Sequence, residues 1–262
     1  MSDVLFAFLL TLLAGLSTAI GAALGVFGKG TSTKTLSLGL GFSAGVMIYV
    51  SLMELLPEGI RALTEAYGEI NGNWAGIAAF FGGIAVIAVI DKLVPDSVNP
   101  HEPSSIDHPA RKHALMRTGL FTAGALAIHN FPEGFATFIA ALQEPQVAIA
   151  VAVAIAIHNI PEGLAVAIPV YQATGSRRKG FTLAALSGLA EPAGALIGYL
   201  ILMPFISDTL FGIVFAAIAG IMVFISLDEL LPAAHEFGEH HLTVYGLIGG
   251  MAVMAVSLVL FI

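Results

Sequence analysis

The chain has 262 residues, of which 57% are hydrophobic and only 11% are charged, and its formal net charge is −8. Soluble globular domains carry about 25% charged residues, so this composition excludes a soluble enzyme or a secreted domain and indicates a protein with several membrane spans. With 10 Lys and Arg and no Cys, the chain also lacks a basic surface for nucleic acid, disulfides and thiolate metal sites.

Eight apolar stretches are long enough to cross a bilayer, which takes about 20 helical residues. We therefore expect an all-α membrane protein with eight transmembrane helices in one domain, 1–262. Most connections are short, but Pro, Ser, His and charged residues at 95–117 predict a flexible, solvent-exposed loop between the third and fourth spans. The spans cover residues 4–27, 36–58, 75–94, 118–141, 146–170, 181–204, 209–233 and 243–262.

The positive charges predict the orientation. Nine of the ten Lys and Arg residues lie in or beside odd-numbered loops, whereas Arg61 alone lies in an even-numbered one. Because Lys and Arg accumulate on the cytoplasmic side, we expect the odd loops, 95–117 included, in the cytoplasm and both termini outside. The nine residues are Lys29, Lys34, Lys92, Arg111, Lys112, Arg117, Arg177, Arg178 and Lys179.

Two sequence repeats connect spans that run in opposite directions. Residues 44–57 read AGVMIYVSLMELLP in the second span, and residues 219–232 read AGIMVFISLDELLP in the seventh. Residues 128–134 read IHNFPEG in the fourth span, and residues 157–163 read IHNIPEG in the fifth. Inverted repeats on broken helices, with binding near the midplane, are typical of secondary transporters. Common ancestry without functional symmetry is the alternative interpretation.

The HNxPEG motif carries the residues that predict a metal site. His129 and Glu133 are four residues apart and share one helical face, and Asn130 is three residues from Glu133. Pro132 has no amide hydrogen, so it kinks the helix and frees the carbonyl oxygen of Ile128. The fifth span repeats this device, and the sixth adds one more carboxylate before a proline; the residues are His158, Asn159, Pro161, Glu162, Glu191 and Pro192.

Three carboxylates near mid-membrane need compensation. An acidic side chain there costs about 2.5–3.5 kcal/mol, and no Lys or Arg lies in the core of any span. The carboxylates must therefore be protonated or bind a cation. Imidazole, carboxylate and amide oxygen together suit Zn, Fe or Mn better than Ca or Mg. Seven ligands exceed one tetrahedral site, which favours two adjacent metals sharing Glu133 and Glu162; the seven are His129, Asn130, Glu133, His158, Asn159, Glu162 and Glu191.

Several other interpretations stay open. The polar residues can join helices by hydrogen bonds or relay protons. An intramembrane zinc hydrolase would carry HExxH, which these motifs lack because Asn follows His. The sequence does not separate a carrier from a metal channel, and the ligands do not distinguish an importer from an exporter.

At these motifs the chain resembles the ZIP (Zrt-, Irt-like) family of divalent metal transporters and, within it, the bacterial ZupT-like branch. The resemblance covers all eight spans. The matching segments are SLMELLPEG at 51–59, HNFPEGFATF at 129–138, HNIPEGLAVAIPVY at 158–171, SGLAEPAGALIG at 187–198 and DELLPAAHE at 228–236.

The resemblance implies a transporter rather than an enzyme. It would import zinc, iron, manganese, cobalt or cadmium ions across the bacterial inner membrane, with no prosthetic group. The resemblance also implies a 3+2+3 arrangement, with spans 1–3 and 6–8 as the inverted repeat. An elevator motion would slide spans 1, 4, 5 and 6 against spans 2, 3, 7 and 8. Two metal positions are implied, one lined by His129, Glu133, His158 and Glu162 and the other by Asn130, Glu133, Asn159, Glu162 and Glu191.

Polar residues near two span ends are candidates for metal entry and exit. The alternative interpretation is interfacial charge at helix ends. Divalent metal ions and membrane lipid are the expected partners, and a homodimer stays open because one chain names no interface. The candidates are Met53 and Glu54 at the outer end of the second span, Asp228 and Glu229 at the inner end of the seventh, and His235 and Glu236 just after it.

Overall fold

The computed structural model describes residues 3–28, 33–93, 110–143, 145–202, 207–237 and 240–260, and these ranges contain helices and no strand. The prediction of an all-α chain is therefore confirmed for them. The elements are α1 (Asp3–Phe27), α2 (Thr33–Val50), η1 (Ser51–Leu55), α3 (Leu56–Tyr67), α4 (Glu69–Leu93), α5 (Ala110–Gln143), α6 (Pro145–Thr174), α7 (Arg177–Gly188), α8 (Ala190–Leu202), α9 (Asp208–Ile225), η3 (Ser226–Leu230), α10 (Leu231–Phe237) and α11 (His240–Leu260).

Within the described residues, six helical stretches are long and apolar enough to cross a membrane. They contain most of the first, second, third, sixth, seventh and eighth predicted spans, so the chain is a multi-pass membrane protein. The fourth and fifth predicted spans, 118–141 and 146–170, lie inside the long helices α5 and α6. The six stretches are Asp3–Phe27, Ser37–Tyr67, Glu69–Ile90, Arg177–Ile201, Thr209–His235 and His241–Val259.

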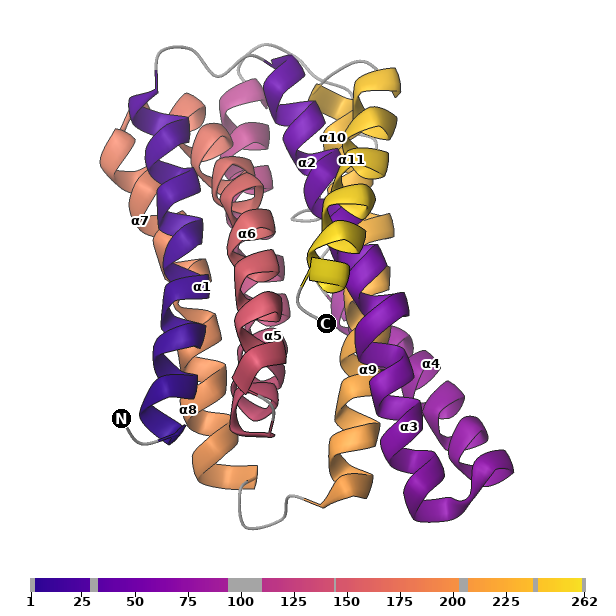
Figure 1. Cartoon of the computed structure of the whole chain (residues 1–262). Helices are drawn as coiled ribbons and strands as arrows, with labels where there is room; N and C mark the ends of the chain where they lie inside the picture. Colours follow the sequence, from indigo (N-terminus) through magenta and orange to yellow (C-terminus); the bar gives the residue numbers. More distant parts are fainter. Residues whose placement is uncertain are drawn as a thin grey trace.

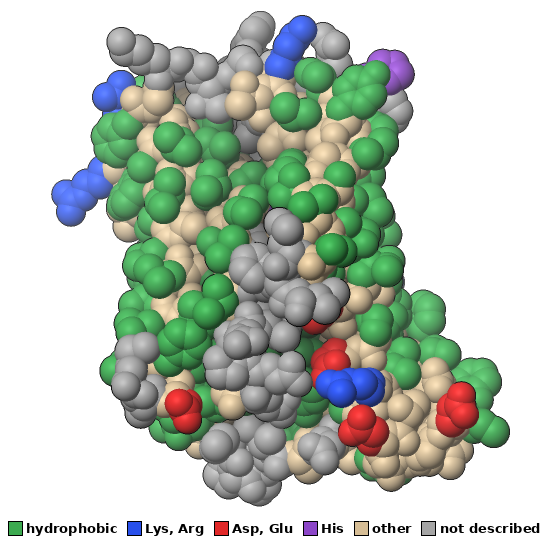
Figure 2. Space-filling model, viewed as in Figure 1, with side chains coloured by type: hydrophobic (Ala, Val, Ile, Leu, Met, Phe, Trp, Pro, Cys, Tyr) green, Lys and Arg blue, Asp and Glu red, His purple; other side chains and the backbone are tan. Residues whose placement is uncertain are grey.

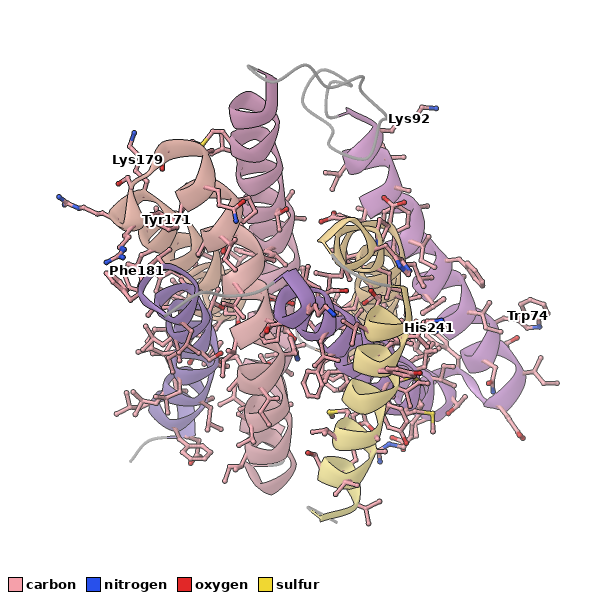
Figure 3. All side chains as sticks on the ribbon, turned by 90° about the horizontal axis from the view of Figure 1, so that it is seen from above. Trp74, Lys92, Tyr171, Lys179, Phe181 and His241 are labelled. Carbon is pink, nitrogen blue, oxygen red and sulfur yellow. The ribbon has the colours of Figure 1, made fainter. Side chains whose placement is uncertain are left out.

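The outer surface is apolar over the middle of the molecule. On the face in Figure 2, hydrophobic side chains predominate among the described residues of the middle part, and most of the charged side chains in view lie toward the upper and lower ends. Trp74 on α4 is 68% exposed and points away from the helices (Figure 3). Exposed apolar surface of this extent marks an interaction surface, and its position suits contact with lipid.

The helices form two groups (Figure 1). We call α1 and α5–α8 the motif group, because it contains both HNxPEG motifs. The second, the repeat group, consists of α2–α4 and α9–α11 with η1 and η3, and it contains both copies of the longer repeat. Helices pack extensively within each group, whereas the groups meet chiefly where α2 lies against α6 and α5 lies against α9.

Both copies of the longer repeat contain a π-helical segment at the same place. Ser51–Leu55 separates α2 from α3, and Ser226–Leu230 separates α9 from α10. In each copy the amide of the next residue donates to the carbonyl five residues earlier. Pro57 and Pro232 lack an amide hydrogen, and their rings would clash with an α-helical carbonyl, which the wider turn avoids. The two spans run in opposite directions (Figure 1).

The sixth predicted span, 181–204, is two helices rather than one. The helix is interrupted at Leu189, between α7 and α8. Pro192 cannot donate to the carbonyl of Gly188, and its ring disfavours a continuous helix there. The break places Glu191 in the first turn of α8.

The predicted loop at 95–117 is too long at its C-terminal end. Helix α5 begins at Ala110, inside the predicted loop, because residues 110–117 (ARKHALMR) consist largely of good helix formers. Hydropathy alone places the start of this helix at residue 118, because it registers the apolar part of the helix and not the polar turns that precede it. Residues 94–109 lie outside the described residues.

Glycines set the closest helix contacts. A Cβ added at Gly250 of α11 would collide with the carbonyl oxygen of Phe42, and one at Gly45 of α2 would collide with that of Leu247. Small residues at four-residue spacing permit such approach of membrane helices. Among the glycines that the structure describes, collisions of this kind with a second helix occur between helices of the same group. Each group is therefore tightly packed within itself.

Two adjacent glycines in α11 give a matched test of this packing. Gly250→Ala should lower the free energy of unfolding by about 1–3 kcal/mol because its methyl group meets the α2 backbone. Thermal unfolding in detergent measures the change. Gly249→Ala is the control, because its Cβ would have no atom within 4 Å and Ala favours the helix by up to about 1 kcal/mol. Equal unfolding temperatures for the two variants would contradict the packing.

Candidate metal site

The predicted ligands of α5, α6 and α8 meet inside the motif group. Glu133 is 3% exposed, and the other described members of the set are completely buried. Helices α5 and α6 continue through Pro132 and Pro161, so the carbonyls four residues earlier lack their usual amide donor. The completely buried members are Asn130, His158, Asn159, Glu162 and Glu191.

The glycine that ends each HNxPEG motif is where another helix crosses. A Cβ at Gly134 of α5 would collide with the carbonyl oxygen of Glu191, which brings α8 against α5. A Cβ at Gly163 of α6 would collide with the carbonyl oxygen of Thr18, which brings α1 against α6. The motif therefore supplies both the polar side chains and the close approach that encloses them.

Short contacts link the buried groups between helices. His158 Nε2 on α6 lies 3.1 Å from Glu133 Oε1 on α5. The Asn159 side-chain amide donates to the carbonyl oxygen of Ala14, at 3.1 Å, and to Glu191 Oε1. These contacts tie α1, α5, α6 and α8 together around the candidate site.

Both asparagines are oriented by their amide nitrogens. Asn130 Nδ2 donates to the carbonyl oxygen of Ser187 at 3.2 Å, and Asn159 Nδ2 donates as described above. Within the described part of the chain, Asn130 Oδ1, Asn159 Oδ1 and Glu191 Oε2 are buried and have no hydrogen-bond partner. A buried acceptor left without a donor costs about 1–3 kcal/mol. A cation would satisfy all three.

The described side chains of the candidate ligands lie close together, but they do not converge on one common point. No three of the described His, Asp and Glu side chains stand in a group that could hold a metal ion as it is. The backbone of His129 belongs to α5, one turn before Glu133, but its side chain lies outside the described residues.

A cavity of about 120 Å³ leads to Glu133 from the end of the molecule where α3 lies. Its polar lining consists of Glu54, Glu58 and Arg61 from the second span, with Glu133 and Thr137 from α5. The remaining lining is apolar and comes mainly from α5 and α9, so the cavity lies between the two groups. At its mouth, Arg61 Nη2 lies 2.5 Å and Arg61 Nε lies 3.0 Å from the two Glu58 carboxylate oxygens.

The candidates for entry and exit have different surroundings. Glu54 lines the cavity, whereas Met53 is 56% exposed. Asp228 is half-buried and Glu229 is 9% exposed in η3, and His235 is exposed in the last turn of α10. The Glu236 side chain lies outside the described residues.

Sequence reasoning missed Glu58 and Arg61 as cavity residues. Helical spacing could have found them, because Glu58 is four residues after Glu54 and Arg61 is three residues after Glu58, which places all three near one face. The π-helical segment before them shifts that face, so spacing alone does not show that it borders α5.

Comparison with known proteins decides the family. Residues 91–258 match the model of the family described as "ZIP Zinc transporter". The chain belongs to this ZIP family. Three proteins named "Zinc transporter ZupT" are similar over essentially the whole chain. That of Corynebacterium aurimucosum is 62% identical, over 100% of this chain and 99% of its own. That of Corynebacterium glutamicum is 60% identical (98% and 100%), and that of Streptococcus mutans 58% (100% of both).

Membership of the ZIP family confirms the resemblance drawn from the motifs. The matched residues include both HNxPEG motifs, Glu191 and the second copy of the longer repeat. The full-length relatives extend the similarity to α1, α2, η1 and α3, which contain Ala14, Glu54 and the first copy of the repeat.

Asn159→Ala should destabilise the protein, because it leaves Glu191 Oε1 and the Ala14 carbonyl without this donor. We expect the free energy of unfolding to fall by about 1–3 kcal/mol, measured by thermal unfolding without added metal. Asn73→Ala is the control, since Asn73 is exposed in the first turns of α4 and donates to the Glu69 carbonyl at 2.7 Å. An Asn159→Ala protein as stable as the control would argue against the interhelical link.

Proposed function

We propose that this ZIP protein imports zinc into the cytoplasm through the buried donor set of α5, α6 and α8. One observation carries the proposal: imidazole, carboxylate and amide groups lie together in an apolar helix group, with buried acceptor oxygens that lack a donor among the described residues. The relatives named zinc transporters support zinc as the cargo. Iron, manganese, cobalt and cadmium ions suit the same donors and complete the proposed substrate range.

The proposed site is binuclear. Glu133 and Glu162 would be shared by two metal positions, one completed by His129 and His158 and the other completed by both asparagines and Glu191. The 3.1 Å approach of His158 Nε2 to Glu133 Oε1 supports the first position. The unsatisfied Oδ1 atoms of Asn130 and Asn159 and Oε2 of Glu191 support the second.

The proposed topology has eight spans in a 3+2+3 order, with α5 and α6 as the central pair and both termini outside the inner membrane. In Figure 1, α1 ends, and α2 and α7 begin, at the upper end of the molecule. The basic residues in the first turns of α2 and α7 therefore share one end, which the positive-inside rule assigns to the cytoplasm; they are Lys34, Arg177, Arg178 and Lys179. The cavity at the α3 end then opens to the outside.

The proposed mechanism is alternating access of elevator type. Within each group the helix backbones approach closely, so each group can move as one body. The two groups share a smaller contact, and a cavity lies between them. In this conformation the cavity gives an ion from outside a route to Glu133. Movement of the motif group along the repeat group would then carry the occupied site toward the cytoplasm.

Zinc uptake into liposomes containing the purified protein tests the function. Wild type should give saturable uptake, and Glu133→Ala should reduce it by at least about tenfold because a shared ligand is lost. Glu65→Ala is the control, since it removes an exposed carboxylate at the end of α3.

A well-folded Glu133→Ala protein with wild-type flux would overturn the assignment of the site. Absence of zinc flux in wild type would exclude zinc as the cargo, and uptake of iron and manganese would be assayed next. Loss of flux in Glu65→Ala as well would show that carboxylate removal harms the protein generally.

Glu54→Gln tests the cavity as the entrance. The Glu54 carboxylate lines the cavity and raises the local cation concentration there, so its removal should raise the zinc concentration for half-maximal uptake by up to about fivefold at low salt. The effect should shrink as salt is added, while the maximal rate stays close to that of wild type. Glu69→Gln, an exposed carboxylate on α4 that is not among the cavity residues, is the control. Identical uptake curves for the two variants would exclude Glu54 from the entry path.

A further inference from the structure

We propose that Ser43 positions Glu162 for metal binding and is a contact of the repeat group with the metal site. Ser43 lies in α2 and is completely buried. Glu162 and the other acceptor of Ser43 lie in α6, so the contact crosses between the two helix groups. The inference deepens the proposed function and rests on it, because Glu162 matters here as a metal ligand.

The hydroxyl of Ser43 has two acceptors on α6. Ser43 Oγ is 3.4 Å from Glu162 Oε1 and 3.3 Å from the carbonyl oxygen of His158, and it donates to both. A serine hydroxyl has one hydrogen, so the two long distances describe a bond shared by both acceptors. Ser43 therefore hydrogen-bonds both the carboxylate and the backbone of the HNIPEG motif.

Other buried hydroxyls of α2 and η1 bond within the repeat group. Ser37 Oγ is 2.9 Å from the hydroxyl of Thr243 on α11, and Ser51 donates to the carbonyl oxygen of Met47 at 2.6 Å. Ser43 instead faces the motif group at the point where Gly39 lies next to Pro161. Its hydroxyl thus meets the metal site rather than its own helix group.

The internal repeat shows that the span does not need a polar residue at this position. The two copies align at an offset of 175 residues, from Ala44 with Ala219 onward, so the counterpart of Ser43 is Ile218. Ile218 is 3% exposed and belongs to the apolar core. Burial of a hydroxyl is unfavourable unless it is hydrogen-bonded, and the acceptors available to Ser43 belong to the metal site.

The bond limits the orientations of the Glu162 carboxylate. With Oε1 held toward α2, the carboxylate keeps fewer rotamers and pays less entropy when a cation orders it. The effect belongs to this conformation, in which the cavity reaches Glu133. Movement of α6 along α2 would break the bond, so Ser43 favours the state that admits an ion from outside.

The test compares Ser43→Ala with Ser37→Ala in the full-length protein in liposomes. Ser43→Ala should raise the zinc concentration for half-maximal uptake by about three- to tenfold, the size expected for the loss of one typical intramolecular hydrogen bond. Its maximal rate should stay within about twofold of wild type. Ser37→Ala also removes a buried hydroxyl from α2 but should leave half-saturation unchanged.

A double-mutant cycle separates positioning from a general structural effect. Zinc binding to the purified chain is measured by calorimetry for wild type, Ser43→Ala, Glu162→Ala and the double variant. If Ser43 acts through Glu162, Ser43→Ala weakens binding in the wild-type background and has little effect beside Glu162→Ala, which removes the side-chain acceptor.

Three results would decide against the inference. Additive losses in the cycle would make Ser43 a structural residue, and equal curves for Ser43→Ala and Ser37→Ala would give it no special role. In both cases wild-type zinc binding and flux persist, so the proposed function stands. Absence of zinc binding and flux in wild type would instead overturn the proposed function, and the role of Ser43 with it.

Discussion

Carboxylates enclosed in an apolar helix group need a compensating positive charge, and the rest of this structure depends on that requirement. Glu133, Glu162 and Glu191 are at most 3% exposed, and no Lys or Arg lies in the core of any span. Among the described residues, the contacts of these groups include neutral amide and hydroxyl donors and one imidazole. Those donors orient the carboxylates without neutralising them permanently. A fixed Lys or Arg would satisfy the charge and close the site, whereas neutral donors leave it to an exchangeable cation.

The same motif that supplies the carboxylates also encloses them. Glu133 and Glu162 are each followed by a glycine, at which α8 or α1 crosses at backbone distance. A larger residue there would separate the helices and admit more water, which would weaken each electrostatic contact. The close approach thus serves the chemistry as well as the packing. It also makes the motif group one tightly packed body, which the proposed movement of the whole site would require.

The sequence predicted the features that depend on local pattern. Long apolar stretches predicted the six described stretches that are long and apolar enough to cross a membrane, and the HNxPEG spacing predicted polar side chains that lie together on α5 and α6. It did not predict the break at Leu189 or the start of α5 at Ala110, because hydropathy registers apolar length rather than the balance of helix propensity and proline sterics. Glu58 and Ser43 were missed for another reason: their importance arises from α5 and α6 lying beside the second span, a tertiary contact that one sequence pattern does not encode. The placement of His129 relative to Glu133 stays a prediction from spacing.

The two copies of the longer repeat share a backbone but differ in chemistry, and under the proposed elevator mechanism this difference would make the two end states of the cycle unequal in free energy. Both copies contain the π-helical segment, followed by a proline. One copy presents a hydroxyl, Ser43, to Glu162, whereas the other carries Ile218 in the apolar core. If the two copies were chemically identical, the outward-open and inward-open states would tend toward equal energy. Under the proposed mechanism a single polar group on one side would make them unequal, because this conformation keeps a hydrogen bond that the moved site would lose. The asymmetry would therefore favour the conformation described here, in which the cavity reaches Glu133, and in the proposed import cycle this is the state in which the empty site receives an ion.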